Sequence, residues 1–342
     1  MSAGLSEPEL CAVGAFLSDQ GVPVAGRLSA ALIAGGRSNL TFRLSDGRSQ
    51  WVLRTPPRAG RTPSAHDVAR EHAMTSALAG TPVPVPPAVA LCQDEAVIGA
   101  PFAVSGFVAG AAIRSRPDLD ELPDAAVTAL AGELVSVLAA LHRVDYAAAG
   151  LASFARPGSY AERQLRRWRG QWELVAGGAQ QELGEQVAAR LAAEVPEQRA
   201  TTIVHGDFRI DNTLVDLAAG PGGPHVAAVL DWELAAIGDP VADVAMMCAY
   251  RDPVFDLIIG SPGAWTSERL PPAGELARMY EAAGGVPLAG WDFHLALAYY
   301  KVAVIAAGIH HRYRAGAGSG AGYDTAGQSV GPYLELALAT LR

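Results

Sequence analysis

The stretch IVHGDFRIDN, residues 203–212, and the later stretch AVLDWE, residues 228–233, decide how the fold is interpreted. In each stretch a short apolar run delivers an acidic side chain, Asp207 or Asp231, into a polar segment. Short apolar runs bounded by polar residues are typical of strands, and functional groups concentrate on the loops that follow them. We therefore expect a small sheet that presents both carboxylates at one edge.

The order and spacing of His205, Asp207 and Asn212 are typical of a kinase catalytic loop. In such a loop the Asp accepts the proton of an incoming hydroxyl, and the Asn five residues later holds a metal. Asp231 then occupies the position at which these enzymes hold magnesium. One carboxylate cannot do both jobs, because the base must stay free to meet the hydroxyl. A lone Asp after a strand is usually a turn former or helix cap, but the three residues in this order favour phosphoryl transfer.

The size and charge of the chain argue against several classes of protein. Its 342 residues, half of them apolar, are enough for two lobes with sizeable cores. The net charge of -9 argues against nucleic acid as the main partner, because phosphate backbones are bound through an excess of Lys and Arg. The three cysteines are widely spaced and form neither a metal-ligand pattern nor an even disulfide framework, which fits a reduced cytoplasm.

No segment is expected to act as a membrane anchor. Residues 1–21 contain three acidic residues and lack the basic start and apolar block of a signal peptide. The apolar stretches 125–141 and 295–309 are interrupted by Glu133 and Lys301 and are too short to span a bilayer. We expect both to be buried core helices of a cytoplasmic protein, monomer or homodimer, with no membrane partner.

Residues 1–109 are predicted to form a nucleotide-binding lobe with a five-stranded antiparallel sheet. A capping box at Ser6 opens a first helix. A loop at residues 34–39, which contains Ser38 and Asn39, either brings backbone N–H groups close to phosphates or is a plain hairpin turn. The runs of β type cover residues 28–33, 40–44, 51–54, 88–92 and 102–107, with a hairpin turn at 45–48.

Arg54 and Glu71 are expected to form an ion pair in this lobe. Arg54 ends the third strand, and Glu71 lies on a helix that Ser64 can cap and that runs to Leu78. A cation on a strand paired with an acid on the next helix orients ATP in kinases. Arg binds phosphate bidentately but has a different shape from the usual Lys, so the geometry of phosphate binding must differ.

Residues 110–342 are predicted to form a larger, mostly helical lobe. At the end of the preceding lobe, Phe107 and Val108 are expected to contact the nucleotide, with backbone groups of Val108 and Ala109 beside the adenine. Asp239 and Asp243 are expected to be structural, because Asp bonds nearby backbone N–H groups in turns. Helical patterns cover residues 124–142, 160–176, 181–193, 241–249, 275–283, 291–313 and 330–341.

A basic and aromatic segment, residues 163–172, is the candidate acceptor-binding helix. Trp168 and Trp172 are four residues apart and share one helix face. The simpler interpretation is that this face packs on the core while the Arg side chains lie in solvent. The alternative is a wall for an anionic, apolar substrate such as an acyl-CoA, because Trp stacks and Arg pairs with phosphate. The candidate substrate residues are Arg163, Trp168, Trp172, Arg209 and Glu233.

Together these motifs resemble the aminoglycoside phosphotransferase-like kinases, and within them the branch found fused to acyl-CoA dehydrogenases. The resemblance runs from about Gly35 to Arg312 and is most specific in HGDFRIDN, residues 205–212. It implies an α+β, two-lobed protein-kinase-like fold that binds ATP or GTP with Mg²⁺ and transfers the γ-phosphoryl group to a hydroxyl of a small molecule. It also implies that Asp207 is the base, that Asn212 and Asp231 bind magnesium, and that an Arg at the position of Arg54 is normal in this branch.

Three functions stay open from the sequence. The first is an active small-molecule kinase, with a hydroxyacyl-CoA-like acceptor favoured over an aminoglycoside, which is polycationic and would favour an acidic cleft. The second is a catalytically inactive nucleotide-binding protein, suggested by Arg54. The third is a hydrolase that uses Asp207 and Asp231, which would leave Asn212 without a role.

Overall fold

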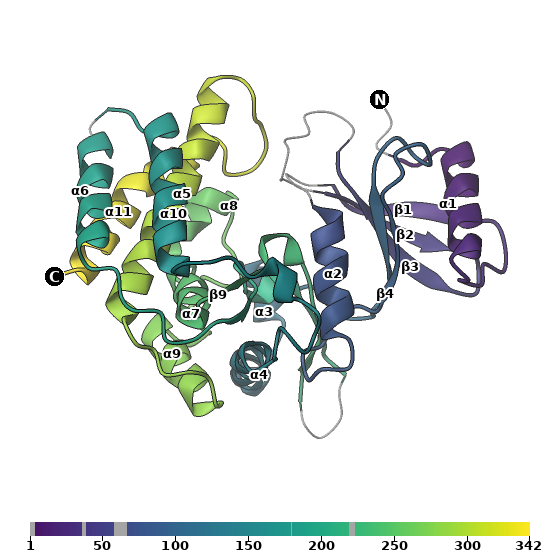
Figure 1. Cartoon of the computed structure of the whole chain (residues 1–342), viewed down its shortest axis with the longest axis horizontal. Helices are drawn as coiled ribbons and strands as arrows, with labels where there is room; N and C mark the ends of the chain where they lie inside the picture. The colour runs from purple at the N-terminus through teal and green to yellow at the C-terminus, as the bar shows by residue number, and fades with distance from the viewer. Residues whose placement is uncertain (1–3, 36–38, 58–66, 179, 219–222) are drawn as a thin grey trace. The chain divides into compact units, whose positions relative to one another are not determined.

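The computed structural model describes residues 4–35, 39–57, 67–178, 180–218 and 223–342. The chain divides into two compact units (Figure 1). The first consists of Met1–Gly110 with Ala227–Ala235, and the second of Ala111–Val226 with Ala236–Arg342. The segment Ala227–Ala235, which carries Asp231, is therefore part of the first unit, a grouping that the sequence pattern did not indicate.

A five-stranded antiparallel sheet forms the centre of the first unit, as predicted. The strand order is β1-β2-β3-β5-β4, and the predicted strand ends are correct to within two residues. The strands are β1 (Ser29–Gly35), β2 (Leu40–Ser45), β3 (Gln50–Thr55), β4 (Ala88–Cys92) and β5 (Phe102–Gly106).

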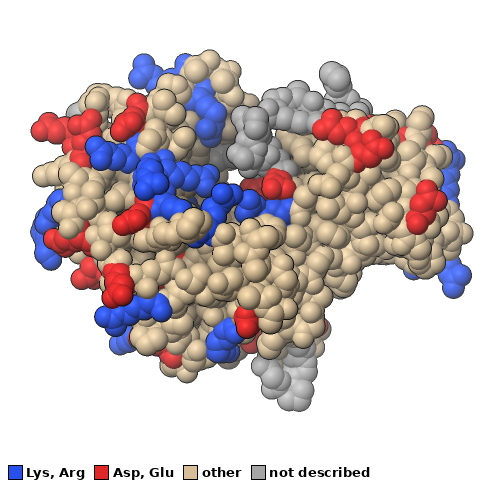
Figure 2. All heavy atoms as spheres, in the orientation of Figure 1, with Lys and Arg blue, Asp and Glu red and all other residues tan. Residues whose placement is uncertain are grey.

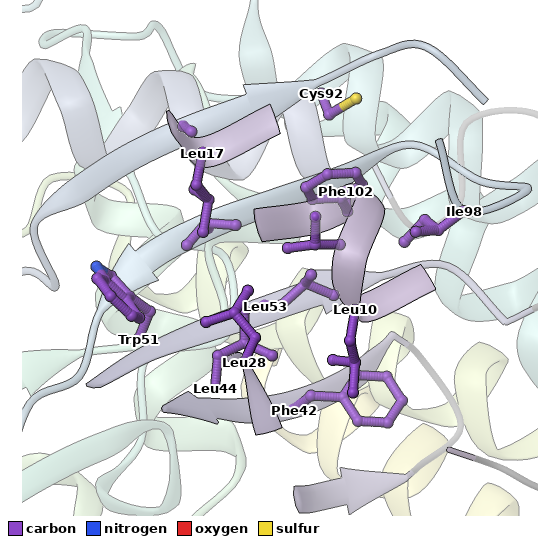
Figure 3. Close-up of a cluster of buried hydrophobic side chains, with 13 residues drawn as sticks. Leu10, Leu17, Leu28, Phe42, Leu44, Trp51, Leu53, Cys92, Ile98 and Phe102 are labelled. Carbon is purple, nitrogen blue, oxygen red and sulfur yellow. The ribbon is translucent and has the colours of Figure 1, made fainter. Parts of the chain in front are cut away.

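The helix α1 (Glu7–Asp19) covers one face of this sheet. Its apolar residues Leu10 and Leu17 pack on alternate residues of the strands, such as Phe42 and Leu53 (Figure 3). The predicted capping box is present, because the Glu9 carboxylate accepts a hydrogen bond of 2.7 Å from the backbone N–H of Ser6. Since side chains alternate along a strand, burying Leu53 against α1 turns Arg54 to the opposite face.

The helix α2 (Val68–Leu78) covers that opposite face. Its cap is Asp67, whose side chain accepts from the backbone N–H of Arg70 at 2.9 Å. The residue predicted to cap this helix, Ser64, lies outside the described residues. The helix itself begins at Val68, later than a cap at Ser64 would place it. The segment Ala227–Ala235 joins the first unit partly through Arg70, which donates to the carbonyl of Ala235 at 3.2 Å.

The second unit is mostly helical. Its longer helices are α4 (Asp124–His142), α5 (Tyr160–Val175), α6 (Gln180–Ala193), α7 (Pro240–Ala249), α9 (Ala273–Ala282), α10 (Trp291–Arg314) and α11 (Val330–Thr340). All seven correspond to predicted helices. Two short α-helices, α3 (Arg116–Asp120) and α8 (Asp256–Ile259), were not predicted, because four or five residues are too few to show a helical period. The 3-10 turns are η1 (Ala152–Phe154), η2 (Ile210–Asn212), η3 (Trp232–Leu234, in the first unit), η4 (Pro253–Phe255) and η5 (Ala326–Ser329).

The strand before Asp207 pairs differently from the expectation. That strand, β6 (Thr202–Val204), pairs antiparallel with β9 (Ala236–Gly238). The strand before Asp231, β8 (His225–Val229), belongs to a separate two-stranded sheet, as does β7 (Thr213–Asp216). The prediction of one small sheet for both acidic residues is therefore wrong. Short apolar runs identify strands but not their partners.

The two most apolar helices, α4 and α10, are longer than the apolar stretches that predicted them. At 19 and 24 residues they are long and apolar enough to cross a membrane by length and composition, so the prediction that they are too short is wrong. However, 56% and 72% of their most apolar windows are buried inside the structure. The helix α10 packs on α5, α7 and α11, which fits the predicted role of a core helix.

Candidate active site

Arg54 is the centre of an ion-pair cluster in the first unit. Its Nη1 lies 2.6 Å from Oε1 of Glu71, and its Nη2 lies 3.1 Å from Oδ1 of Asp231. Glu233 also contributes to the electrostatic field at Arg54 and Glu71. We call these four residues the Arg54 cluster. The predicted pair of Arg54 and Glu71 is thus present, and Asp231 extends it. Glu233, predicted as a substrate residue, lies in this cluster.

The backbone holds Asp231 in an unusual conformation. Its φ of 63° and ψ of 57° lie in the left-handed region, which no other non-glycine residue of the described ranges adopts. Asp and Asn tolerate this region better than most residues, but such strain persists only where the surroundings enforce it, commonly at functional sites. Here the next residue, Trp232, is fully buried, and its indole N–H donates to the carbonyl of Val229 at 2.9 Å. The packing of Trp232 therefore fixes the direction of the Asp231 carboxylate.

Burial sets the charges of the Arg54 cluster. Removal from water raises the pKa of Glu71 to about 7, against the opposing effect of Arg54. The same burial disfavours the charge on Arg54, but the carboxylates of Glu71 and Asp231 outweigh it and raise the pKa of Arg54. Arg54 is therefore a permanent cation, whereas Glu71 changes its charge near neutral pH.

This raised pKa predicts a pH-dependent stability that Glu71→Gln should remove. The folded protein keeps a proton that the unfolded chain gives up above pH 4.5, so the free energy of unfolding falls as the pH rises from about 4.5 to about 7. We expect Glu71 to contribute a fall of about 3 kcal/mol between pH 5 and pH 8, from about 1.4 kcal/mol for each pKa unit. Urea unfolding at both pH values measures it.

The matched control for this experiment is Asp19→Asn, which removes an exposed acid from the same unit. The control should keep the pH-dependent fall of the unaltered protein. Equal falls in the unaltered protein and in Glu71→Gln would contradict the assigned titration.

The predicted catalytic loop lies in the second unit. The Asp207 carboxylate accepts from Arg209 Nε at 3.1 Å, from Arg209 Nη2 at 3.2 Å and from Asn212 Nδ2 at 2.8 Å. The same Asn212 Nδ2 donates to the Asp207 carbonyl, also at 2.8 Å. Burial alone would raise the pKa of Asp207, but Arg209 and Asn212 outweigh it and the pKa is lowered. Asp207 is therefore a fixed, ionised carboxylate.

Asp243 anchors this loop from helix α7. Its two oxygens accept from the backbone N–H groups of His205 at 2.6 Å and Gly206 at 2.7 Å. The imidazole Nε2 of His142 lies 3.2 Å from the same carboxylate, and its Nδ1 lies 2.8 Å from the hydroxyl of Tyr280. These interactions agree with the expected structural role of Asp243. Its partners, however, come from distant parts of the sequence and gave no local signal.

Arg209 is fully engaged with acidic residues of its own loop. Besides the two contacts with Asp207, its Nη1 lies 2.7 Å from Oδ2 of Asp211, and its guanidinium stacks over the rings of Tyr250 and Phe255. These contacts give Arg209 a role that needs no substrate, and its role as a substrate residue stays a prediction. Its geometry is that of a positioning residue for Asp207.

The candidate acceptor helix α5 has one buried and one accessible Trp. Trp172 is only 2% exposed and packs on Tyr300, so the prediction that it contacts a substrate is wrong. Trp168 is half-buried and donates from its indole N–H to Gln164 at 3.0 Å. Arg163 donates to the carbonyls of residues 156–158, which ties down the loop before α5 and makes a substrate role unnecessary. Helical spacing placed both Trp on one face but could not give their depth.

The buried position of Trp172 predicts opposite effects for two glycine substitutions. A Cβ at Gly184 on α6 would overlap the Trp172 ring, so Gly184→Ala should destabilise the protein by about 1–3 kcal/mol. A Cβ at Gly170 on α5 meets no atom within 4 Å, so Gly170→Ala should stabilise it by about 0.5–1 kcal/mol through helix propensity. The midpoint of urea unfolding measures both. A stabilising Gly184→Ala would contradict the packing of Trp172.

The predicted nucleotide contacts are only partly described. Ser38 lies outside the described residues. Asn39 is buried, and neither its amide oxygen nor its amide nitrogen has a hydrogen-bond partner within the described part of the chain. Phe107 follows β5, and the guanidinium of Arg43 lies 4.6 Å from its ring centroid. For Val108, the described residues provide no backbone hydrogen bond. Its N–H and C=O are therefore available to a ligand.

Asn212 and Asp231 each provide an oxygen suited to magnesium. The Asn212 Nδ2 group points at two acceptors of Asp207, which leaves Oδ1 as the unused atom of the amide. Asp231 uses Oδ1 for Arg54, and its Oδ2 has no hydrogen-bond partner among the described residues. Carboxylate and amide oxygens are the hard ligands that Mg²⁺ prefers. The donor chemistry of both residues therefore fits this ion.

Lys301 is a charged residue near the catalytic loop that we did not predict as a site residue. Its Nζ donates to the carbonyl of Gly206 at 3.2 Å, directly before Asp207. The sequence signal was its position as a single cation within an apolar stretch, and we used Lys301 only as an interruption of that stretch and as part of the family resemblance.

Residues 29–297 match the sequence model of the Phosphotransferase enzyme family. The chain belongs to this family. The match covers both units, including all the residues of the Arg54 cluster and of the catalytic loop. This membership makes the chain a phosphotransferase and confirms the predicted family.

Curated relatives in this family are parts of larger proteins. The chain is 35% identical over 306 residues to acyl-CoA dehydrogenase family member 10 of Mus musculus, covering 88% of this chain and 28% of that protein. It is 33% identical over 323 residues to acyl-CoA dehydrogenase family member 11 of Gallus gallus, covering 92% of this chain and 40% of that protein. The chain thus spans less than half of the length of these relatives.

Solved structures confirm the predicted kinase-like fold. A crystal structure from Ralstonia eutropha JMP134, assigned provisionally as an aminoglycoside phosphotransferase, has 34% identity and a TM-score of 0.81 and covers 96% of this chain and 97% of its own. The aminoglycoside phosphotransferase APH(4)-Ia in complex with AMP-PNP and hygromycin B has 17% identity and a TM-score of 0.62, covering 96% of this chain and 98% of its own. The second likeness shows the fold alone.

Proposed function

We propose that this phosphotransferase is a small-molecule kinase that moves the γ-phosphoryl group of ATP to a hydroxyl, with a hydroxyacyl-CoA as the favoured acceptor. The observation that carries the proposal is the geometry of Asp207. Arg209 and Asn212 hold this carboxylate in one direction and keep it ionised, so it is able to accept a hydroxyl proton. A protein that only binds nucleotide has no use for such a carboxylate.

In this proposal the Arg54 cluster binds the phosphates of the nucleotide. Glu71 and Asp231 hold two of the guanidinium nitrogens of Arg54, and its Nε has no hydrogen-bond partner within the described residues. Nη1 and Nη2 each carry a second N–H that these contacts do not use, and a fixed guanidinium pairs well with phosphate oxygens. The backbone of Val108 supplies groups for the adenine edge. Asn212 and Asp231 each offer an oxygen that would hold Mg²⁺, and this ion would neutralise negative charge on the phosphates.

The transfer step balances with the residues of this chain and the two substrates. The hydroxyl oxygen of the acceptor forms a bond to the γ-phosphorus while the bond from that phosphorus to the diphosphate oxygen breaks. The hydroxyl proton passes to Asp207 and then to solvent. The products are ADP and the phosphate monoester of the acceptor.

The sign of the charge near the loop favours an anionic acceptor. Arg166, Arg167 and Arg169 on α5 are exposed, and Figure 2 shows Lys and Arg side chains gathered on this face of the second unit. A CoA thioester is anionic, whereas an aminoglycoside is polycationic and would be repelled. The names of the curated relatives, acyl-CoA dehydrogenase family members 10 and 11, point to the same class of compound.

A screen of acceptors at equal concentration tests the proposal. Purified protein with Mg²⁺ and either ATP or GTP is given hydroxyacyl-CoAs, aminoglycosides or no acceptor, and the released nucleoside diphosphate is measured. We expect release of ADP that depends on hydroxyacyl-CoA. Release that depends on an aminoglycoside would favour an aminoglycoside O-phosphotransferase. Nucleotide binding without transfer to any acceptor would favour an inactive protein.

A further inference from the structure

A small cavity lies beside the catalytic loop within the second unit. Its volume is about 20 Å³, and it is lined by α5, by α7, by α10 and by Gly206. Most of the lining is apolar and includes Met246, Leu297 and Ala298. A space of this size holds about one water-sized group. The cavity therefore has room beside Lys301 for a single polar atom of a ligand.

Lys301 supplies the positive charge in this cavity. Its Nζ donates one hydrogen bond to the Gly206 carbonyl and lies 5.6 Å from the centroid of the Trp168 ring. An ammonium group has three donors. No carboxylate oxygen of the described residues lies within 4.0 Å of Nζ. A cation in an apolar lining with unused donors favours a ligand that brings an acceptor atom.

Two carboxylates, Asp207 and Asp243, act on Lys301 and offset part of its charge, but neither forms an ion pair with it. Asp243 also lines the cavity, but its oxygens already accept from the N–H groups of His205 and Gly206 and face the His142 imidazole. His294 lies two helical turns before Lys301 on α10, and its Nδ1 has no hydrogen-bond partner among the described residues. Burial lowers the pKa of His294, so its ring is neutral near pH 7. On α5, Gln164 accepts from the Trp168 indole and Arg167 adds a second positive charge.

We propose that this cavity receives the carbonyl or carboxylate oxygen of a hydroxyacyl acceptor and that Lys301 donates a hydrogen bond to it. The inference rests on the proposed function and specifies which end of the acceptor is recognised. Gly206, whose carbonyl accepts from Lys301, directly precedes Asp207. An acceptor whose carbonyl oxygen binds Lys301 would therefore bring a hydroxyl a few bonds along its own chain close to Asp207.

Paired acceptors separate recognition of the carbonyl from general damage to the loop. The pair is a hydroxyacyl thioester of N-acetylcysteamine, which keeps the carbonyl without the phosphates of CoA, and an alcohol of equal length in which a methylene replaces the carbonyl. The free hydroxy acid is a third arm that distinguishes a carboxylate from a thioester. Lys301→Met keeps the length of the side chain and removes the donor.

For Lys301→Met we expect kcat/KM for the thioester to fall about 10- to 100-fold, mainly through KM, which is the size of effect of losing a charged hydrogen bond. The value for the alcohol should change less than about threefold. Lys301→Arg should recover part of the loss. The matched control is Arg312→Gln, which removes an exposed cation from the same helix and should leave both acceptors unaffected.

A binding measurement keeps the inference independent of turnover. Calorimetric titration with the matching acyl thioester that lacks the hydroxyl should show binding to the unaltered protein and about tenfold weaker binding to Lys301→Met. Equal losses for thioester and alcohol, or equal binding of the acyl thioester to both proteins, would overturn the role of Lys301. If the acyl thioester binds through Lys301 but no hydroxyl compound is phosphorylated, the cavity assignment stands and the proposed kinase function fails.

Discussion

Asp207→Asn is expected to lower the rate of phosphoryl transfer by about 10³-fold and to leave nucleotide affinity within about twofold. A positioned base contributes about 10² to 10⁴ to such a reaction, and the amide cannot take the hydroxyl proton. The amide oxygen can still accept from Asn212 and from Arg209 Nη2, but the amide NH2 then meets Arg209 Nε, so urea unfolding checks that the variant is folded before transfer is measured. Transfer is measured as acceptor-dependent release of ADP, and affinity by titration with a non-hydrolysable nucleotide.

The matched control for this variant is Asp216→Asn. Asp216 ends the neighbouring strand β7, and its carboxylate accepts from the backbone N–H of Ala218 rather than from a residue of the catalytic loop. We expect near-normal transfer. If Asp207→Asn retained more than about a tenth of the activity, Asp207 would not be the base. If it lost nucleotide binding as well, the division of labour between the two units would be wrong.

Asp243→Asn should cause the largest loss of stability, about 3 kcal/mol or more. The side chain is buried and accepts hydrogen bonds from two backbone N–H groups beside His142. An amide of equal volume turns one acceptor into a donor, which leaves at least one buried donor unsatisfied and removes a charge from its partners. Urea unfolding gives the loss of free energy.

A second measurement separates local from global damage in Asp243→Asn. Because Asp243 holds the backbone of His205 and Gly206, transfer should fall more steeply than the fraction of folded protein. His142→Gln is the companion variant: it removes one side-chain partner and keeps both backbone contacts, so its effects should be smaller on both measures. Unchanged stability in Asp243→Asn would show that the loop does not depend on this anchor.

The features that the sequence could predict are those with a local pattern. Alternation along β3 placed Arg54 on the face opposite Leu53, and a helix follows with Glu71 in its first turn, so their pairing could be foreseen. The spacing from Asp207 to Asn212 predicted a kinase-like catalytic loop, and the hydrogen bond between these two side chains was found only in the structure. Long-range partners could not be foreseen, because nothing in the local pattern links Asp243 to Gly206 or β6 to β9.

The sequence also could not show how deeply a side chain is buried or which partners it already has. Trp168 and Trp172 have the same helical phase, and only the position of Tyr300 and Gly184 decides that Trp172 is buried. The sequence did not show that Arg209 pairs with Asp207 and Asp211. Charged residues two positions apart pair in this way only when the loop has the right conformation. These interpretations depended on tertiary packing, which periodicity does not describe.

The proposed function requires that this chain phosphorylates a hydroxyl of a hydroxyacyl compound. The most direct measurement is phosphorus NMR of a reaction that contains Mg²⁺, ATP and a hydroxyacyl-CoA. We predict a new phosphate monoester signal that grows in a one-to-one ratio with ADP and is absent with Asp207→Asn. Inorganic phosphate in place of the monoester, or a monoester formed only with an aminoglycoside, would contradict the proposed function.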